Sequence, residues 1–157
     1  MLAILFLSAG CAAPATPLAS TTATPVPLRP GQQAFEATCA SCHQASGAGV
    51  PETFPPLAGS EWVQTPSPEA AIAVVLRGVQ GPLRVQWMTY QGSMPPHREL
   101  LKDAQISEIL TYVRSSWGNQ AAAVTPAQVA GVRKRYGAGQ PWSEAELSKL
   151  FFSTKRR

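Results

Sequence analysis

The chain has 157 residues, which is enough for one compact domain with stretches left over at its ends. Charged residues make up only 14%, and 15 Pro and 12 Gly indicate many turns, which excludes a long-helix bundle or a disordered acidic chain. The net charge of +4 is uneven, because seven of the 13 basic residues follow residue 120. Bases gathered in a tail do not form the basic face of a nucleic-acid binder, so we expect no nucleic-acid partner.

The first residues have the pattern of an export signal. Residues 1–7 form an apolar run that is too short to span a bilayer but long enough for the core of a signal peptide. Small residues then lead to Cys11, as in a bacterial lipobox, where the cysteine is lipidated and becomes the new N-terminus. This accounts for an odd count of three cysteines, so we predict a lipoprotein-type signal over residues 1–10 with Cys11 lipidated. The alternative is an ordinary secretory signal cut near Ala12 and Ala13, which discards Cys11.

Residues 11–30 are built almost wholly from Ala, Pro, Thr, Ser and Leu. Such a segment cannot bury enough apolar surface to order itself, and its prolines keep it extended, so it is predicted to be a linker. An anchor followed by a spacer places the next domain at a periplasmic or other extracytoplasmic membrane face.

The chemistry of the chain is concentrated in the sequence CASCH at residues 39–43. A short helix from Gln32 to Cys42, with Phe35 facing inward, is expected to deliver it. Thiols at Cys39 and Cys42 have the spacing to form two thioethers to one porphyrin, and the imidazole of His43 then reaches the iron. The motif therefore predicts one covalently attached haem c.

Two other kinds of site use a Cys-x-x-Cys pair. The first is a zinc site, of which the pair would be half, but no second Cys/His pair completes the four ligands in this sequence. A thioredoxin-like redox pair is the other, but no strand–turn–helix pattern surrounds Cys39 and Cys42, and His43 would have no role.

A helix is predicted over residues 68–77. Ser67 is the expected N-cap, Pro68 the first residue, and Gly78 ends the helix. Its apolar stripe of Ile72, Val75 and Leu76 is expected to form a wall of the haem pocket.

The order of motifs resembles class I (monohaem) cytochrome c over about residues 31–119. The residues that carry this resemblance are CASCH at 39–43, FPPLAG at 54–59, YQGSMPP at 90–96 and ISEILTYV at 106–113. The resemblance implies an all-α fold of short helices wrapped around one haem, in a domain spanning residues 31–120. It also implies that Phe35 packs with Ile109 and Tyr112, where the first and last helices cross near Gly31.

The same resemblance implies the ligands of the iron. His43 is the proximal ligand, with the Pro55 carbonyl accepting from its ring nitrogen, and Met94 is the distal ligand. A thioether is a soft donor that favours ferrous iron, and Pro95-Pro96 restricts the backbone directly after it. Met88 and His97 are the alternatives to Met94. We expect Met88 to be core filling and His97 to be exposed at the start of a helical stretch.

Trp87 and Tyr90 precede the Met94 loop by a few residues. Each is expected either to donate a hydrogen bond to a haem propionate or to pack around the haem edge, and both roles are compatible.

Residues 121–157 are predicted to be a helical extension. Thr125 and Pro126 begin one expected helix, and residues 141–152 are expected to form a second, amphipathic one. Residues 112–119 together with residues 124–133 are similar to haem domains in cytochrome subunits of quinoprotein alcohol dehydrogenases and to domains fused to copper nitrite reductases. The terminal helix either docks on an acidic partner or anionic membrane, or simply packs Trp142 and Leu147 on the core, which we favour.

These features predict a single-electron carrier and not an enzyme. Its expected partners are redox proteins such as a dehydrogenase, a cytochrome complex or a terminal oxidase or reductase. The alternatives are a haem subunit or module of such a complex, and an open-site haem enzyme or gas sensor.

Overall fold

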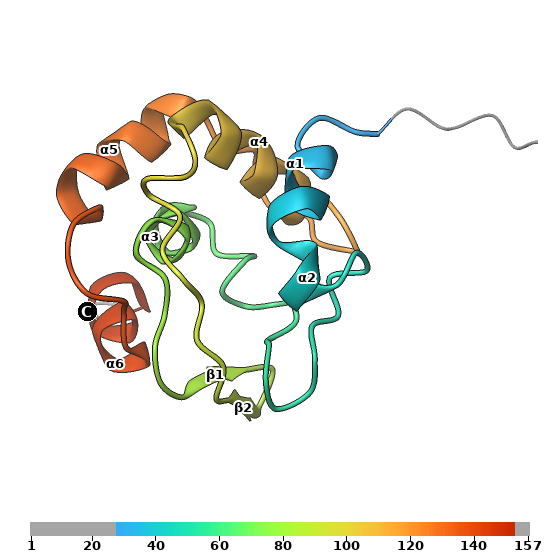
Figure 1. Ribbon diagram of the computed structural model, residues 1–157, viewed down its shortest axis with the longest axis vertical. Coiled ribbons are helices and arrows are strands. Elements are labelled where there is room, and N and C mark those ends of the chain that lie inside the picture. The colour runs from blue at the N-terminus through green and yellow to red at the C-terminus, as the bar shows by residue number, and fades with distance from the viewer. Residues whose placement is uncertain (1–27, 153–157) are drawn as a thin grey trace, which may run out of the picture.

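Short helices and long loops make up most of the computed structural model, which describes residues 28–152 (Figure 1). The helices are α1 (Gln32–Thr38), α2 (Ala40–His43), α3 (Glu69–Arg77), α4 (Asp103–Arg114), α5 (Pro126–Tyr136) and α6 (Glu144–Leu147), the last continued by the π-helical turn η1 (Ser148–Phe152). One antiparallel hairpin joins β1 (Leu83–Val85) to β2 (Met88–Tyr90). The signal sequence, Cys11 and nearly all of the linker lie outside the described residues.

The N-terminal helix α1 packs across α4. Phe35 is fully buried there, with its ring centroid 5.5 Å from that of Tyr112, and Ile109 belongs to the same core cluster. Gly31, the N-cap of α1, has φ 79°, and a Cβ built on it would lie 2.0 Å from the Glu108 carbonyl oxygen. Only glycine allows both this backbone conformation and this approach, so the expected crossing is confirmed.

The structure corrects the expected start of α3 by one residue. Pro68 is the N-cap, and the Ser67 hydroxyl accepts a 3.3 Å bond from the backbone N–H of Glu69 instead of capping the helix from the N-cap position. Gly78 ends the helix as expected.

The β1–β2 hairpin was not expected from the sequence. Its two-residue turn consists of Gln86 and Trp87, with φ of 49° and 68°, although Asn and Gly are the residues that usually take this conformation. The outer edge of β1 is covered by side chains. The carboxylate of Glu61 accepts from the Gln86 N–H at 3.0 Å, and that of Glu144 accepts from the Arg84 N–H at 2.9 Å.

The C-terminal extension lies against the rest of the domain. Thr125 caps α5 in a reciprocal capping box with Gln128, as expected, and Val129 and Val132 are fully buried. Beyond α5, Trp142 and Leu147 are also buried, at 3% and 0% exposure. The side chains of Trp142 and Leu147 therefore pack on the core, as favoured from the sequence, whereas the basic residues 155–157 lie outside the described part of the chain.

We expect Gly31→Ala to destabilise the domain by more than about 2 kcal/mol, because the new methyl group collides with the backbone of α4 in addition to straining φ. Denaturant-induced unfolding of the haem-loaded protein measures this. Gly118→Ala is the matched control, since Gly118 also has positive φ but a Cβ built on it would have nothing within 4 Å. The control should lose only about 1 kcal/mol, and equal losses in the two variants would contradict the steric explanation.

Candidate functional site

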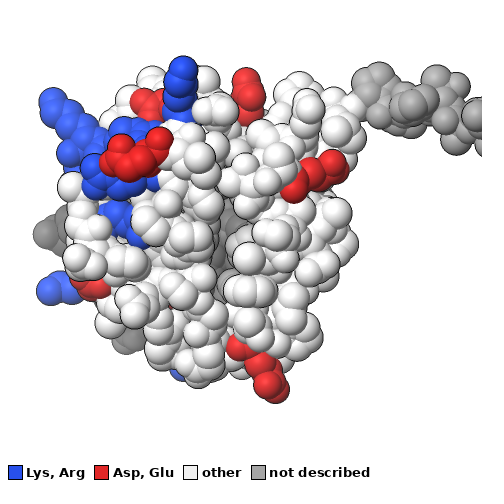
Figure 2. All heavy atoms as spheres, viewed as in Figure 1, with Lys and Arg blue, Asp and Glu red and all other residues white. Residues whose placement is uncertain are grey.

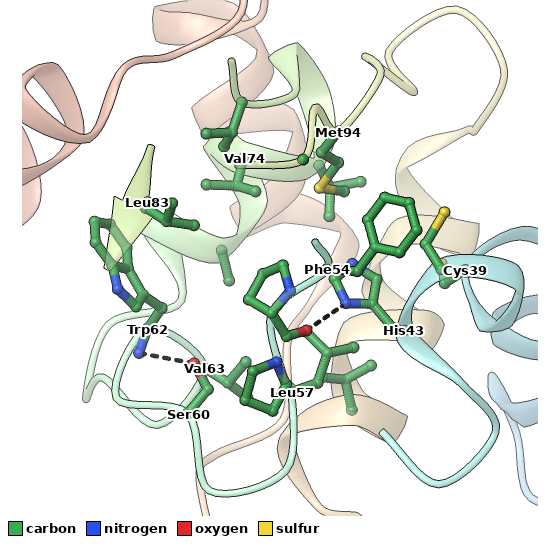
Figure 3. A pocket seen from close by; sticks show the side chains of 18 of the residues that line it. Cys39, His43, Phe54, Leu57, Ser60, Trp62, Val63, Val74, Leu83 and Met94 are labelled. Carbon is green, nitrogen blue, oxygen red and sulfur yellow. Dashed lines mark hydrogen bonds between the residues drawn. The ribbon is translucent and has the colours of Figure 1, made fainter. Parts of the chain in front are cut away.

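One apolar cavity is lined by side chains from helices α1 to α4, from both strands and from the loops between them. Its walls come from α1 and α2, the loop at residues 53–57, α3, the hairpin, the loop around Met94, and α4. Figure 3 shows the side chains of Cys39, His43, Phe54, Leu57, Val74 and Met94 around this space. The face of the molecule seen in Figure 2 is mostly uncharged near its centre, and Lys and Arg gather on the side where α5 lies.

His43 ends α2 and has a fixed ring orientation. Its Nδ1 lies 2.9 Å from the carbonyl oxygen of Pro55, and because a carbonyl only accepts, Nδ1–H is the donor. This leaves Nε2 as the nitrogen able to bind a metal. Burial, opposed in part by the bond to Pro55, lowers the pKa of His43, so the ring is neutral at neutral pH, as ligation requires.

Cys39 and Cys42 lie where the chain passes from α1 to α2. Both are free thiols, and Cys39 is the residue that separates the two helices. Burial, together with the charge of Cys42, raises the pKa of Cys39 to about 11. A thioredoxin-like pair depends on a lowered thiol pKa, so this environment does not suit that chemistry. Within residues 28–152, no three His, Cys, Asp or Glu side chains gather to hold a metal ion, so the described residues do not supply the four ligands of a structural zinc site.

Met94 lines the cavity from the loop that follows the hairpin. Its backbone forms a two-way antiparallel bridge with Val79, with Met94 N–H donating to Val79 O at 2.9 Å and Val79 N–H donating to Met94 O at 3.0 Å. Figure 3 shows its thioether sulfur and the His43 ring entering the same space from different segments of the chain.

This set of residues fits a covalently attached haem. The walls are apolar, as a porphyrin requires, and the two cysteines, three residues apart in the sequence, both line the cavity. The imidazole of His43 and the thioether sulfur of Met94 border the same cavity as candidate iron ligands, and so does the imidazole of His97.

The remaining candidates lie in different environments. Tyr90 is buried and lines the cavity, whereas Trp87 is 93% exposed at the hairpin turn and is not among the lining residues. Met88 is 44% exposed on β2, so the expectation that it fills the core is wrong. His97 is half-buried and borders the cavity, so its expected exposure is wrong as well.

The expected α3 wall also needs correction. Val75 lines the cavity together with Ala70, Ala71 and Val74. Ile72 and Leu76 are fully buried in the core cluster and are not lining residues.

Sequence reasoning missed two buried polar side chains that hold the loops in place. Asn119 accepts from the Gly59 N–H at 2.9 Å and donates to the carbonyls of Leu57 and Val113 at 3.0 and 2.9 Å. It thereby ties the end of α4 to the loop that carries Pro55. Arg114, fully buried, donates to the carbonyls of Val63, Thr65 and Ala122. Neither role has a local sequence signal, because each partner lies in a loop whose path the sequence does not show.

We expect Asn119→Ala to lower the free energy of unfolding by about 2–4 kcal/mol, because Gly59 N–H and two carbonyls then lose their partner inside the protein. Chemical denaturation of the haem-loaded protein measures the loss. Gln120→Ala, at the exposed neighbouring position, is the control and should stay within about 0.5 kcal/mol of the wild type. A similarly small loss for Asn119→Ala would show that water replaces the three bonds.

Comparison with known proteins supports this interpretation of the site. The family model for cytochrome c matches residues 28–117. The chain is 34% identical over 122 residues to cytochrome c-552 of Thermus thermophilus, covering 64% of this chain and 92% of that protein. It is 36% identical over 105 residues to the cytochrome c subunit of alcohol dehydrogenase (quinone) from Gluconacetobacter polyoxogenes, and 36% identical over 93 residues to the cbb3-type cytochrome c oxidase subunit CcoP of Rhodobacter capsulatus.

The extent of these matches differs between relatives. The alignment with the alcohol dehydrogenase subunit covers 66% of this chain but 22% of that subunit, and the one with CcoP covers 58% of this chain and 31% of CcoP. The chain therefore corresponds to a small part of these two longer relatives and to most of cytochrome c-552. With the family model matching more than half of its length and the expected helical fold in place, the chain belongs to the cytochrome c family and has the class I fold.

Proposed function

We propose that this protein is a single-electron carrier with one haem c, attached at Cys39 and Cys42 and ligated by His43 and Met94. The observation that carries the proposal is that His43 and Met94 border one apolar cavity and that each is fixed by backbone contacts. His43 is held through Pro55, and Met94 is held through Val79.

The chain's own residues account for the properties a carrier needs. When bound, haem c supplies an iron that takes up one electron and passes it on. The Pro55 carbonyl fixes the ring of His43 and increases its basicity toward a metal. The Met94 thioether, a soft donor, favours the reduced state, and the apolar walls from α3 and α4 keep water away. Rigid ligands limit the rearrangement that accompanies each change of charge.

The alternative to an electron carrier is an open-site haem enzyme or gas sensor, in which no protein side chain fills the distal position. His97 also borders the cavity and, three residues after Met94, is the other side chain of this segment with a potential metal-binding atom. The identity of the distal ligand therefore decides between a carrier and an open site.

We expect Met94→Ala to abolish the weak sulfur-to-ferric-iron charge-transfer band of the oxidised protein and to lower its reduction potential, because the soft donor is lost. Absorption spectroscopy and potentiometric titration measure the two effects. Met88→Ala is the matched control, since Met88 is a partly exposed methionine on β2, and it should retain the band.

Loss of the band in Met88→Ala but not in Met94→Ala would show that Met88, and not Met94, is the ligand. A wild-type protein without the band that binds cyanide or azide readily would favour the open-site alternative. A Met94→Ala protein whose spectrum changes only when His97 is also replaced would point to His97 as the ligand.

The partners we propose are redox proteins outside the cytoplasm. The relatives include subunits of alcohol dehydrogenase (quinone), gluconate 2-dehydrogenase and cbb3-type oxidase, so domains similar to this one serve in electron-transfer complexes. The alignment with cytochrome c-552 covers 92% of that protein, so the similarity is not confined to subunits of large complexes. The second candidate, a haem subunit of a dehydrogenase or oxidase, predicts that the native protein co-purifies with that complex after mild extraction.

We also propose that Cys11 carries a lipid and that residues 12–30 act as a tether. No helix within residues 28–152 is long and apolar enough to cross a bilayer. We expect Cys11→Ser to move the protein from the membrane fraction to the soluble periplasmic fraction, because one serine cannot be acylated by the lipoprotein pathway. Mass spectrometry of the mature N-terminus checks the same point. An unmodified N-terminus near Ala12 or Ala13 in the wild type would establish the ordinary secretory signal instead.

A further inference from the structure

The backbone around Trp142 is joined to the backbone that holds Met94. Trp142 N–H donates to Gly78 O at 3.0 Å, and Trp142 O accepts from Gln80 N–H at 2.9 Å. Val79 therefore has a parallel bridge to Trp142 on one side and an antiparallel bridge to Met94 on the other. Three segments far apart in the sequence thus form one short, sheet-like contact.

The side chain of Trp142 anchors this contact on α3. The ring is 3% exposed, and its Nε1–H donates to the carbonyl of Ala73 at 2.9 Å. The guanidinium of Arg77 lies 3.6 Å from the ring centroid and also donates through Nε to Gln140 O at 2.8 Å. Stacking under a cation and a bond to a helix carbonyl fix the Trp142 ring against α3.

The segment between Trp142 and Met94 has little room to adjust. Gly78 has φ 73°, and a Cβ built on it would lie 2.1 Å from the Met94 carbonyl oxygen. Its N–H donates to Val74 O at 2.7 Å, and its carbonyl accepts from Trp142. Gly78 is thus in close contact with the Met94 loop while being bonded to both α3 and the extension.

We propose that residues 137–152, a part of the extension, position Met94, the proposed distal ligand. Trp142 restrains the Gly78–Gln80 segment, and this segment in turn restrains the loop of Met94. This inference rests on the proposed ligation by Met94. A loop that carries a ligand opens locally at a lower free-energy cost than the whole domain unfolds. The backbone bonds of Trp142 to Gly78 and Gln80 make that opening rarer, because the Gly78–Gln80 segment cannot move away with Met94.

The simpler explanation is that the extension only adds general stability. The two explanations predict different affinities for a small exogenous ligand. Imidazole binds ferric iron only when Met94 has left it, so its apparent affinity is proportional to the open fraction of the loop. If Trp142 restrains the loop, its loss changes the open fraction of the Met94 loop selectively. If the extension only adds general stability, its loss changes the free energy of global unfolding and leaves the open fraction of the loop nearly unchanged.

The test compares Trp142→Ala with the double variant Val129→Ala/Val132→Ala in the full haem-loaded protein. The control deletes fully buried methyl groups from α5, which takes no part in the Trp142–Val79–Met94 backbone bridges, although Tyr136 at its end packs against the Trp142 ring. Imidazole titration of the oxidised protein, the sulfur-to-iron band and denaturant unfolding are measured for each. We expect Trp142→Ala to bind imidazole about tenfold more tightly than the wild type, and the control to stay within about twofold.

Trp142→Phe keeps an aromatic ring beneath Arg77 but lacks the bond to Ala73, and it should give an intermediate affinity. It also serves as the informative variant if Trp142→Ala does not fold. The proposal is overturned if imidazole affinity follows global stability equally in the Trp142 variants and the control. It is also overturned if Trp142→Phe leaves the imidazole affinity of the wild type unchanged. Failure of the ligation itself shows separately, as a wild-type protein whose imidazole affinity is already that of Met94→Ala.

Discussion

The close approach of Gly31 to the backbone of Glu108 is the constraint on which the site depends. It sets how α1 crosses α4, and each helix leads to one part of the cavity. The end of α1 continues into Cys39–His43, and the residues after α4 include Asn119, which holds the Leu57–Gly59 loop beside Pro55. One backbone contact therefore aligns the segment that supplies the imidazole with the loop that orients it.

Local sequence signals predicted the elements whose partners are near in the chain. The motif at residues 39–43, the Gly78 helix end and the Thr125 cap of α5 are of this kind. The sequence did not predict the β1–β2 hairpin, because Gln86 and Trp87 are not typical of its turn. Nor did it show that His97 borders the cavity, which depends on the path of a long loop, or that Met88 faces solvent, which depends on the hairpin. The contact of Trp142 with Gly78 and Gln80 spans more than sixty residues and has no local signature.

Two of the basic residues of α5 form ion pairs with acidic residues of the same chain. Arg133 pairs with Asp103 at 2.7 Å and donates to the Leu101 carbonyl, and Arg135 pairs with Glu69 at 2.6 Å. These contacts tie α5 to the start of α4 and to α3. The high basic count of the C-terminal part therefore overstates the charge that a partner meets on the described surface, and the face around the cavity carries few charges (Figure 2).

The carboxylates of Glu61 and Glu144, which accept from backbone N–H groups of β1 and its turn, oppose association with other molecules at this edge. An exposed strand edge is a template on which a strand from another molecule can add. Here the Arg84 N–H on β1 and the Gln86 N–H in the adjoining turn already have negatively charged acceptors from elsewhere in the same chain. An incoming strand would have to displace both carboxylates and leave them beside its own backbone carbonyls. The hairpin can therefore present its uncommon, tryptophan-bearing turn to solvent without offering a site for self-association through β1.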